Sequence, residues 1–158
     1  MRVLEIGVGY RPLEGEDVVH LDRRKLEHVE VVWDIDDETG LLPFNDEEFD
    51  MVVIHHVLEH LLYFREVMQE MWRVLKIGGT LDIKVPNYKS SVAFVPGHLR
   101  FFGRHAFDTF DCVLNPLEHY DSTACFKLER IEGEDMGSEF TFILIKREHC
   151  ENQRKWGI

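Results

Sequence analysis

The feature that most constrains this chain is the alternation of short apolar runs with longer segments of helical spacing. The short runs are rich in apolar and β-branched residues and end at Gly, Asp or Asn. This alternation is typical of an α/β protein, in which helices connect the parallel strands of one sheet. We expect strands over residues 2–6, 18–22, 29–35, 50–55, 80–85, 127–132 and 139–146, and we interpret the first five as buried and parallel.

The clearest helix is expected over residues 58–75. Leu, Val, Met and Trp side chains recur there on one broad face, while charged side chains fall mainly on the other. Lys76 places a cation at the expected C-terminus, and Gly78 and Gly79 favour left-handed caps before the next strand. A strand, this helix and another strand predict a right-handed crossover.

The segment 94–110 differs in composition from the rest of the chain. Phe residues alternate there with Pro, Gly and His, and we interpret the segment as a loop with a short helix over the sheet and as a candidate lid. The expected fold class is a Rossmann-like, doubly wound, seven-stranded and mostly parallel sheet with helices on both faces and a C-terminal antiparallel strand. One domain is expected over residues 1–158, with residues 151–158 as a frayed tail.

The charge balance excludes some classes of partner. The chain has 158 residues, with 18 Lys and Arg against 30 Asp and Glu, which gives a net charge of −12. Such a field repels phosphate backbones and anionic surfaces, so we expect neither bulk nucleic acid nor a membrane as partner. We interpret the densest basic cluster, residues 23–25, as the solvated start of a helix.

The cysteines and the N-terminus bear on location. Cys112, Cys125 and Cys150 are an odd number without CxxC spacing, which favours reduced thiols over a disulfide framework or a zinc site. The first residues lack the basic and apolar regions of a secretory signal. Both features indicate a cytoplasmic location.

A glycine-rich turn follows the first expected strand. Residues 5–9 read Glu-Ile-Gly-Val-Gly, and glycines there let a ligand approach the backbone closely. The second expected strand ends at Asp22, whose carboxylate at a strand tip can accept both hydroxyl protons of a ribose. Taken alone, a GxG is also an ordinary strand end and an Asp an ordinary helix N-cap. Their places in the α/β pattern favour a nucleotide or nucleoside site.

Six segments extend this pattern over nearly the first ninety residues. They are residues 3–9, 21–22, 33–35, 42–53, 57–60 and 75–81. In this order and spacing they resemble the successive motifs of the class I S-adenosylmethionine-dependent methyltransferases. The most specific part is the block that contains Leu-Pro-Phe and Phe-Asp, with the Leu-Glu-His that follows it.

The resemblance implies S-adenosylmethionine as cofactor and assigns residues to it. The cofactor-binding residues that it implies are Glu5, Gly7, Gly9, Asp22, Asp34 and Ile35. Asp22 would hold the ribose hydroxyls, Asp34 would face the adenine amine, and Ile35 would pack on the ring. The implied function is transfer of a methyl group to an oxygen, nitrogen or carbon atom of an unidentified acceptor, which we expect to be a small molecule.

Two further pairs of residues are candidates for the acceptor side. His55 and His56, at the tip of the fourth expected strand, are the catalytic candidates, because the reactive methyl group lies near that tip in the family. His98 and Arg100 are candidates for acceptor binding, because His-Leu-Arg-Phe-Phe resembles a segment that borders the acceptor pocket in many small-molecule methyltransferases. The alternative for this segment is a packed aromatic loop.

The chain also departs from the family pattern. Arg11 replaces the third glycine that the family's loop often carries, and residues 10–17 are too few for a full crossover helix. We therefore expect an open site, which the Phe-rich segment, a partner subunit or a second copy in a homodimer would cover. These departures motivate an alternative function, a SAM-binding module without catalysis that acts as a regulatory or scaffolding subunit.

Two other classes of protein share single motifs with this chain. His56-Val-Leu-Glu-His60 matches the HxxEH pattern of inverted zinc proteases, but its place at a strand-to-helix junction favours a methyltransferase, and we expect no metal. A nicotinamide dehydrogenase would use the same glycine-rich turn, but the full GxGxxG is not present.

Overall fold

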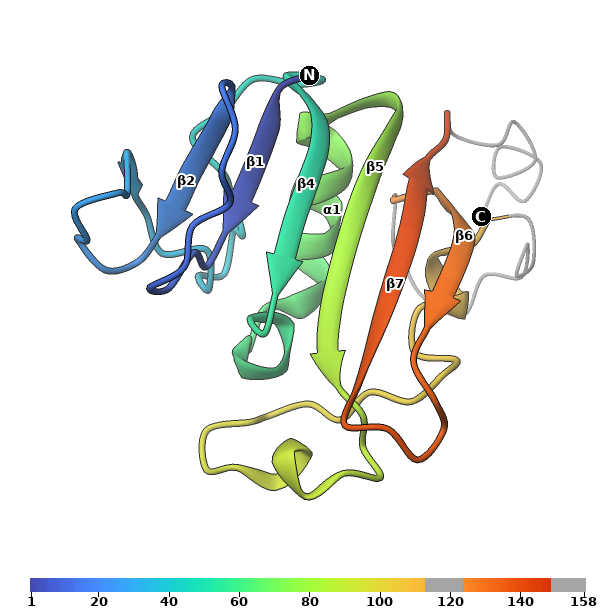
Figure 1. Ribbon diagram of the computed structural model, residues 1–158. Helices are drawn as coiled ribbons and strands as arrows, with labels where there is room; N and C mark the ends of the chain where they lie inside the picture. Colours follow the sequence, from blue (N-terminus) through green and yellow to red (C-terminus); the bar gives the residue numbers. More distant parts are fainter. Residues whose placement is uncertain (113–123, 149–158) are drawn as a thin grey trace.

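A computed structural model describes residues 1–112 and 124–148 (Figure 1). Its strands are β1 (Val3–Ile6), β2 (Val18–Asp22), β3 (Val31–Val32), β4 (Phe49–His55), β5 (Leu75–Pro86), β6 (Phe126–Glu132) and β7 (Glu139–Lys146). They form one seven-stranded sheet in the order β3-β2-β1-β4-β5-β7-β6. The first five strands pair in parallel, and β7 is antiparallel to both β5 and β6. The predicted Rossmann-like, seven-stranded and mostly parallel sheet with an antiparallel strand near the C-terminus is confirmed.

The helix expected over residues 58–75 is divided in two. The 3₁₀ turn η1 (Leu58–His60) ends at Leu61, whose backbone is extended, and the helix α1 (Phe64–Val74) begins after Tyr63. The carboxylate of Asp36 accepts the backbone N–H groups of Leu62 and Tyr63 at 2.8 and 3.0 Å, so these donors are satisfied outside a helix. The expected glycine cap is wrong, because α1 passes into β5 at Leu75, before Gly78.

One face of the sheet packs against α1 (Figure 1). Apolar side chains of the strands and of the helix form one buried cluster there. It includes Leu4, Ile6, Val52, Ile54, Leu81, Ile83, Phe142 and Leu144 from the sheet and Val67, Met68, Met71 and Val74 from α1. Alternate residues of the same strands therefore point to the other face.

That other face, which we call the open face, carries no helix among the described residues (Figure 1). The expectation of helices on both faces is thus wrong for this part of the chain. The cause lies in the connections, because residues 7–17 between β1 and β2 and residues 23–30 between β2 and β3 form only turns and bends. A full crossover needs a dozen or more residues, usually with a helix.

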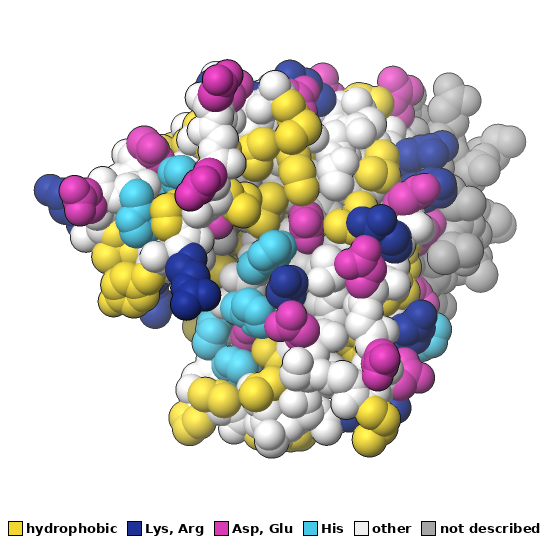
Figure 2. Space-filling view, viewed as in Figure 1, with side chains coloured by type: hydrophobic (Ala, Val, Ile, Leu, Met, Phe, Trp, Pro, Cys, Tyr) yellow, Lys and Arg dark blue, Asp and Glu magenta, His cyan; other side chains and the backbone are white. Residues whose placement is uncertain are grey.

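Apolar and charged residues share the open face, and the strand register places them in rows. One row runs through Val3, Met51, Thr80 and Ile145, and the next runs through Glu5, Val53, Asp82 and Ile143. Figure 2 shows hydrophobic side chains on the upper part of this face and histidines near the lower edge of the sheet. The open face is therefore amphipathic.

The Phe-rich segment contributes to the core more than to the surface. Phe102, Phe107 and Phe110 are buried in the cluster of the α1 face, whereas Phe94 and Phe101 are exposed and pack on each other at 5.1 Å between ring centroids. A 3₁₀ turn stands at each end of the segment, η2 (Ser91–Phe94) leading into it and η3 (Asp108–Phe110) ending it. In Figure 1, η2 lies below the carboxyl ends of β4 and β5.

Two expectations about the rest of the chain have different outcomes. A disulfide joins Cys112 and Cys125, so the expectation of reduced thiols is wrong for this pair, while Cys150 lies outside the described residues. The expected tail, residues 151–158, also lies outside them. No helix in the described ranges is long and apolar enough to cross a membrane.

Candidate functional site

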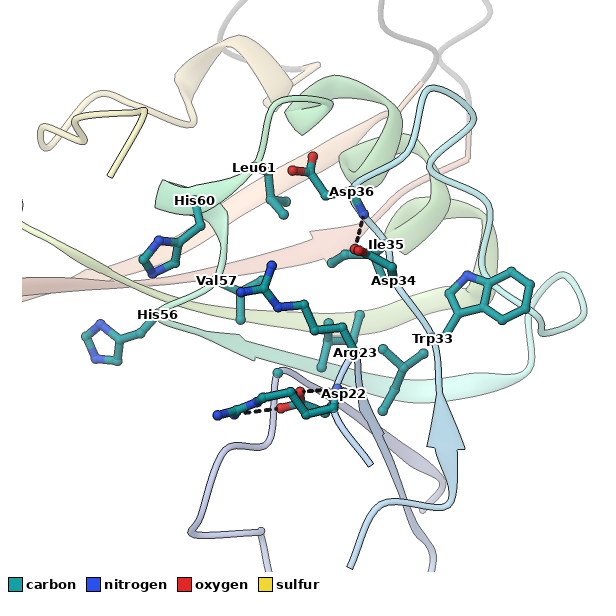
Figure 3. Close-up of a pocket in the computed structure, with 14 residues that line it drawn as sticks. Asp22, Arg23, Trp33, Asp34, Ile35, Asp36, His56, Val57, His60 and Leu61 are labelled. Atoms are coloured by element: carbon teal, nitrogen blue, oxygen red, sulfur yellow. Dashed lines mark hydrogen bonds and ion pairs between the residues drawn. The ribbon is translucent and has the colours of Figure 1, made fainter. Parts of the chain in front are cut away.

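A pocket of about 310 Å³ lies at the carboxyl ends of β1, β2 and β4 (Figure 3). Its lining comprises Ile6, Gly7, Leu21, Asp22, Arg23, Arg24, Trp33, Asp34, Ile35, Asp36, His56, Val57, His60 and Leu61. β1 has β2 on one side and β4 on the other, so the direction of the strand order changes here. In open α/β sheets, ligands bind outside the carboxyl ends of the strands at this switch point. The volume of the pocket is at the lower end of the range for small-molecule sites.

Asp22, the last residue of β2, is buried at the edge of the pocket. Its carboxylate accepts the backbone N–H of Gly9 at 3.1 Å, and both the backbone N–H and the guanidinium of Arg24 at 2.9 to 3.2 Å. Burial acts to raise the pKa of Asp22, but the hydrogen bonds from Arg24 and Gly9 outweigh it, and the pKa lies below its ordinary value. Asp22 is therefore an ionised hydrogen-bond acceptor, and in this structure Arg24 donates to both of its carboxylate oxygens.

The two glycines of the first turn have left-handed backbones. Gly7 lines the pocket with a φ of 75°, and an added Cβ would lie 2.2 Å from Cγ2 of Val57. A side chain at this position would clash with Val57, so the sequence needs glycine here. Gly9, with a φ of 63°, lies outside the pocket lining and binds Asp22 through its N–H.

The loop after β3 forms another wall of the pocket (Figure 3). Ile35 is buried and apolar, and Asp34 accepts the backbone N–H of Asp36 at 3.0 Å. Leu61 adds a second apolar side chain from the segment that precedes α1. This wall thus presents an apolar surface with carboxylates beside it, which suits a flat base with an exocyclic amine.

Glu5 and His55, both predicted site residues, lie outside the pocket lining. The carboxylate of Glu5 accepts the backbone N–H of Leu13 at 2.9 Å and lies 3.4 Å from Nε2 of His20. Nε2 of His55 lies 3.1 Å from Oδ1 of Asp82. Both side chains lie on the open face. Glu5 binds the loop between β1 and β2 there, and His55 binds Asp82 of the neighbouring strand β5.

His56 differs from His55 because it lines the pocket (Figure 3). Its backbone has a φ of 55°, a left-handed value that is uncommon for a residue other than glycine. Its Nδ1 lies 3.6 Å from Oε1 of Glu59, and its Nε2 lies 3.3 Å from Oε2 of Glu139. The nearby carboxylate of Glu59, together with that of Glu139, raises the pKa of His56 above its ordinary value, and partial burial opposes this only in part.

The predicted acceptor residues His98 and Arg100 lie beside the pocket rather than in its lining. Arg100 donates to the carbonyl oxygens of Leu61 and Leu62 at 2.9 and 2.7 Å. The ring of His98 meets the ring of His60, which does line the pocket, at 4.7 Å between centroids. The segment after β5 is thereby fastened to the segment that precedes α1.

Three charged residues of the pocket wall, Arg23, Arg24 and Asp36, were not among the predicted site residues. Arg23 and Arg24 were interpreted as a solvated helix start, yet both line the pocket, and Figure 3 shows Arg23 extending into it. Asp36 lines the pocket and caps the start of α1 through Leu62 and Tyr63. The proximity of the two arginines to Asp22 in the sequence was the available signal.

The pocket and the strand order define a Rossmann-like methyltransferase fold, and comparisons with known proteins agree. A family model described as a methyltransferase domain matches residues 15–83, so the glycine-rich turn lies outside the match. A putative methyltransferase from Bacillus halodurans has a TM-score of 0.65 at 17% identity and covers 93% of each chain. Comparison with curated sequences finds no relative.

Two further solved structures share the fold. A putative methyltransferase in complex with the Trm112 activator, from Haloferax volcanii, has a TM-score of 0.64 at 15% identity over 95% of this chain and 83% of the other. A 1,6-didemethyltoxoflavin-N1-methyltransferase from Burkholderia thailandensis, with bound S-adenosylhomocysteine, has a TM-score of 0.65 at 15% identity over 92% and 71%. At these identities the likeness establishes the fold alone.

The matched residues, 15–83, are less than half of the chain, and they contain the motif segments from residues 21–22 to residues 75–81. The match and the fold support a methyltransferase with S-adenosylmethionine as its cofactor, and the acceptor is unidentified.

Proposed function

We propose that this chain, as a single domain, binds S-adenosylmethionine in the strand-end pocket and transfers its methyl group to a small-molecule acceptor. The observation that carries the proposal is the convergence of Asp22, Ile35 and His56 on one pocket at the switch point of the sheet. A Rossmann-like fold binds nucleosides at this place, with an acidic side chain at the tip of the second strand.

The residues of the pocket fit the cofactor in kind. Asp22 is an ionised acceptor for ribose hydroxyls, and Ile35 with Leu61 offers apolar surface for the adenine ring. Asp34 lies beside that surface with a carboxylate for the adenine amine. Glu5 and Gly9, which lie outside the lining, stay predictions for the methionine portion.

Arg24 competes with the ribose for Asp22. The carboxylate of Asp22 already accepts N–H groups on both oxygens, and two of these donors belong to the Arg24 guanidinium. The Arg24 side chain is half-exposed, so it can leave without disturbing the core. We expect Arg24→Ala to increase the affinity for S-adenosylmethionine, by up to about tenfold, because breaking a partly exposed ion pair costs on the order of 1 kcal/mol.

The chemistry that the cofactor supplies is an electrophilic methyl group on a sulfonium, which leaves as a thioether when the acceptor atom bonds to the methyl carbon. The chain's contribution is to hold the two reactants in line. Where the acceptor must lose a proton, His56 is the proposed base, because it lines the pocket while His55 is bonded to Asp82 outside it.

Calorimetric titration tests the cofactor. Wild type should bind S-adenosylmethionine and S-adenosylhomocysteine saturably and should not bind NAD. Asp22→Asn should lose most of this affinity, while Asp17→Asn should not, because Asp17 is exposed and directly precedes β2, at the opposite end of that strand from Asp22. Binding of the sulfur nucleosides that Asp22→Asn leaves unchanged would contradict this site.

Transfer of label from methyl-labelled S-adenosylmethionine to a panel of small acceptors then tests the reaction. We expect His56→Ala to lower kcat strongly for an acceptor that must lose a proton. His55→Ala should change kcat little, which makes it the matched control. Equal losses in both variants would contradict the assignment of His56 as the base.

The open face favours a second candidate function, that of a SAM-binding subunit that acts with a protein partner or in a homodimer. Met51, Ile143 and Ile145 place partly exposed apolar groups on that face without a covering helix in the described ranges. A neighbour in fold is a complex with the Trm112 activator, which shows a partner for that protein. Molar mass by light scattering decides whether this chain forms a dimer, and activity restored only by a cell fraction would favour the subunit.

A cytoplasmic location also stays a proposal. The Cys112–Cys125 disulfide counts against it, because disulfides are rare in cytosolic proteins. Alkylation of thiols during cell lysis, followed by mass spectrometry of the peptides with Cys112 and Cys125, would show whether the pair is reduced in cells.

A further inference from the structure

Three side chains of metal-ligand type converge beside the pocket from two segments that are far apart in the sequence. Glu59 and His60 belong to η1, and His98 follows η2. One ligand atom from each residue lies within 4.8 Å of the other two. Figure 2 shows histidines gathered where the sheet meets the segment below it. Two imidazoles and a carboxylate form a ligand set typical of zinc and related divalent ions.

Both imidazoles are oriented by backbone carbonyl groups. Nδ1 of His60 lies 3.0 Å from the carbonyl oxygen of Gly97, and Nδ1 of His98 lies 3.0 Å from that of Ala93. A carbonyl oxygen only accepts, so each Nδ1 is the donor, and in the neutral ring this leaves the lone pair on Nε2. This is the arrangement that orients metal-binding histidines in proteins.

Glu59 supplies an observation that points to a ligand. Its side chain is only 2% exposed, yet Oε2 has no hydrogen-bond partner among the described residues. Oε1 faces Nδ1 of His56 at 3.6 Å, which is longer than a good hydrogen bond. A buried carboxylate oxygen without a partner is costly, and a cation is the group that would satisfy it.

We propose that Glu59, His60 and His98 form a binding site for a divalent transition-metal ion of the zinc class. Ligand atoms around a tetrahedral zinc ion lie roughly 3.3 Å apart, as bonds of about 2.0 Å require. The present separations need to shorten by no more than about 1.5 Å, and His60 is exposed, so rotation of side chains can close them. Three protein ligands leave a fourth position for water or another ligand.

This site differs from the one that the HxxEH pattern suggests. In that pattern both histidines lie on one helix, but His56 has a left-handed backbone and does not belong to the group. His98, which lies 38 residues beyond His60, takes its place. An ion here would join η1 to the segment after β5 and would lie at the edge of the pocket, because His60 is common to both.

Titration with Co²⁺ tests the site through a spectroscopic signal that requires no activity. Untagged wild-type protein, freed of metal with a chelator, should develop visible absorption that saturates at one equivalent and disappears when Zn²⁺ is added. Zn²⁺ should also raise the melting temperature, because an ion that binds only the folded state stabilises it. Absence of a saturable signal in wild type would overturn the proposal.

Variants assign the ligands. His60→Ala and His98→Ala should each weaken Co²⁺ binding at least tenfold, and Glu59→Gln, which keeps the size of the buried side chain, should do the same. His105→Ala is the matched control, because His105 is 83% exposed and pairs with the nearby Asp108. Binding that survives His98→Ala with full affinity would show that the ion is held elsewhere.

The proposals of a metal site and of a cofactor site can be tested separately. His98 does not line the pocket, so His98→Ala should bind S-adenosylmethionine as wild type does while losing Co²⁺. Asp22→Asn should show the reverse. If His98→Ala loses the binding of both Co²⁺ and S-adenosylmethionine while it retains the circular dichroism of wild type, the result would contradict a separate metal site.

Discussion

The two faces of the sheet are built from the same strands but are covered differently. On the α1 face, Leu144 is fully buried against the core, whereas its neighbour Ile143 on the open face is only partly buried. The strands alternate regularly on both faces, so the difference comes from the connections. Where a connection is long enough for a helix, as between β4 and β5, the face is covered, and where it is short, the face stays open.

On the open face, side chains are buried by single neighbouring groups and not by a packed layer of secondary structure. Glu5 and Asp22 are buried there by single loops and by Arg24 rather than by a packed helix. On the α1 face, the polar group of Lys146 is instead enclosed by secondary structure, between Leu75 of β5 and the Trp72 ring of α1. The candidate pocket lies where the two kinds of environment meet, because η1 and Leu61 line it from one side and the loops after β1, β2 and β3 line it from the other.

The largest expected effect compares two neighbours in β7. Leu144→Ala removes a fully buried side chain and should lower the free energy of unfolding by about 2–5 kcal/mol. Ile143→Ala should cost about 1 kcal/mol, because its side chain faces the open face and loses fewer contacts. Urea unfolding of both variants with unchanged m-values measures the difference.

This pair of variants also tests whether a chain covers the open face. If a partner or second copy buries Ile143, then Ile143→Ala should cost as much as Leu144→Ala, and the cost should depend on protein concentration. Equal costs at every concentration would contradict the assignment of Ile143 to an uncovered face.

A smaller effect compares two lysines on the two faces. Lys146 is 2% exposed, donates to the carbonyl oxygen of Leu75 at 2.7 Å and lies 4.2 Å from the Trp72 ring centroid. Lys146→Met leaves that carbonyl without this donor and should cost about 1–3 kcal/mol. Lys84→Met should change the free energy of unfolding by less than about 0.5 kcal/mol, because Lys84 is part-exposed and 3.8 Å from Glu139.

Thermal unfolding of the two methionine variants at one pH gives both values. A neutral Lys146→Met would show that the buried ammonium costs as much to desolvate as its contacts contribute. The comparison of the two faces would then hold for apolar side chains only.

Most of the sheet could be predicted from the sequence, because strand positions follow from local patterns. The bounds of β2 and β7 match the predicted ranges, and the other strands differ at one or both ends. The uncovered face was harder to predict from the sequence, since the fold class implies helices that short connections cannot form. The break in the helix after Leu61 depends on Asp36, which lies 26 residues before Leu62 in the sequence and accepts its backbone N–H only in the folded chain.

The candidate site could be predicted where residues follow strand ends and not where loops fold back. Asp22, Asp34, Ile35 and His56 line the pocket as their places after strands suggested. The bonding of Asp22 by Arg24, and the approach of His98 to His60, depend on side-chain packing between segments. Periodicity and motif spacing carry no information on such contacts.

The smallest expected effect concerns Asp22, whose pKa is lowered because the hydrogen bonds from Arg24 and Gly9 outweigh burial. A carboxylate with a lowered pKa in the folded state stabilises the fold above its ordinary pKa of 3.8, and this contribution is lost as the pH falls through the folded value. Asp22→Asn should therefore flatten the loss of stability below about pH 4, by up to about 1 kcal/mol. Unfolding in urea from pH 3 to 7 measures it, with the exposed Glu14→Gln as control. If the free energy of unfolding falls as steeply at low pH in Asp22→Asn as in wild type, then the hydrogen bonds from Arg24 and Gly9 to Asp22 do not stabilise the fold in solution.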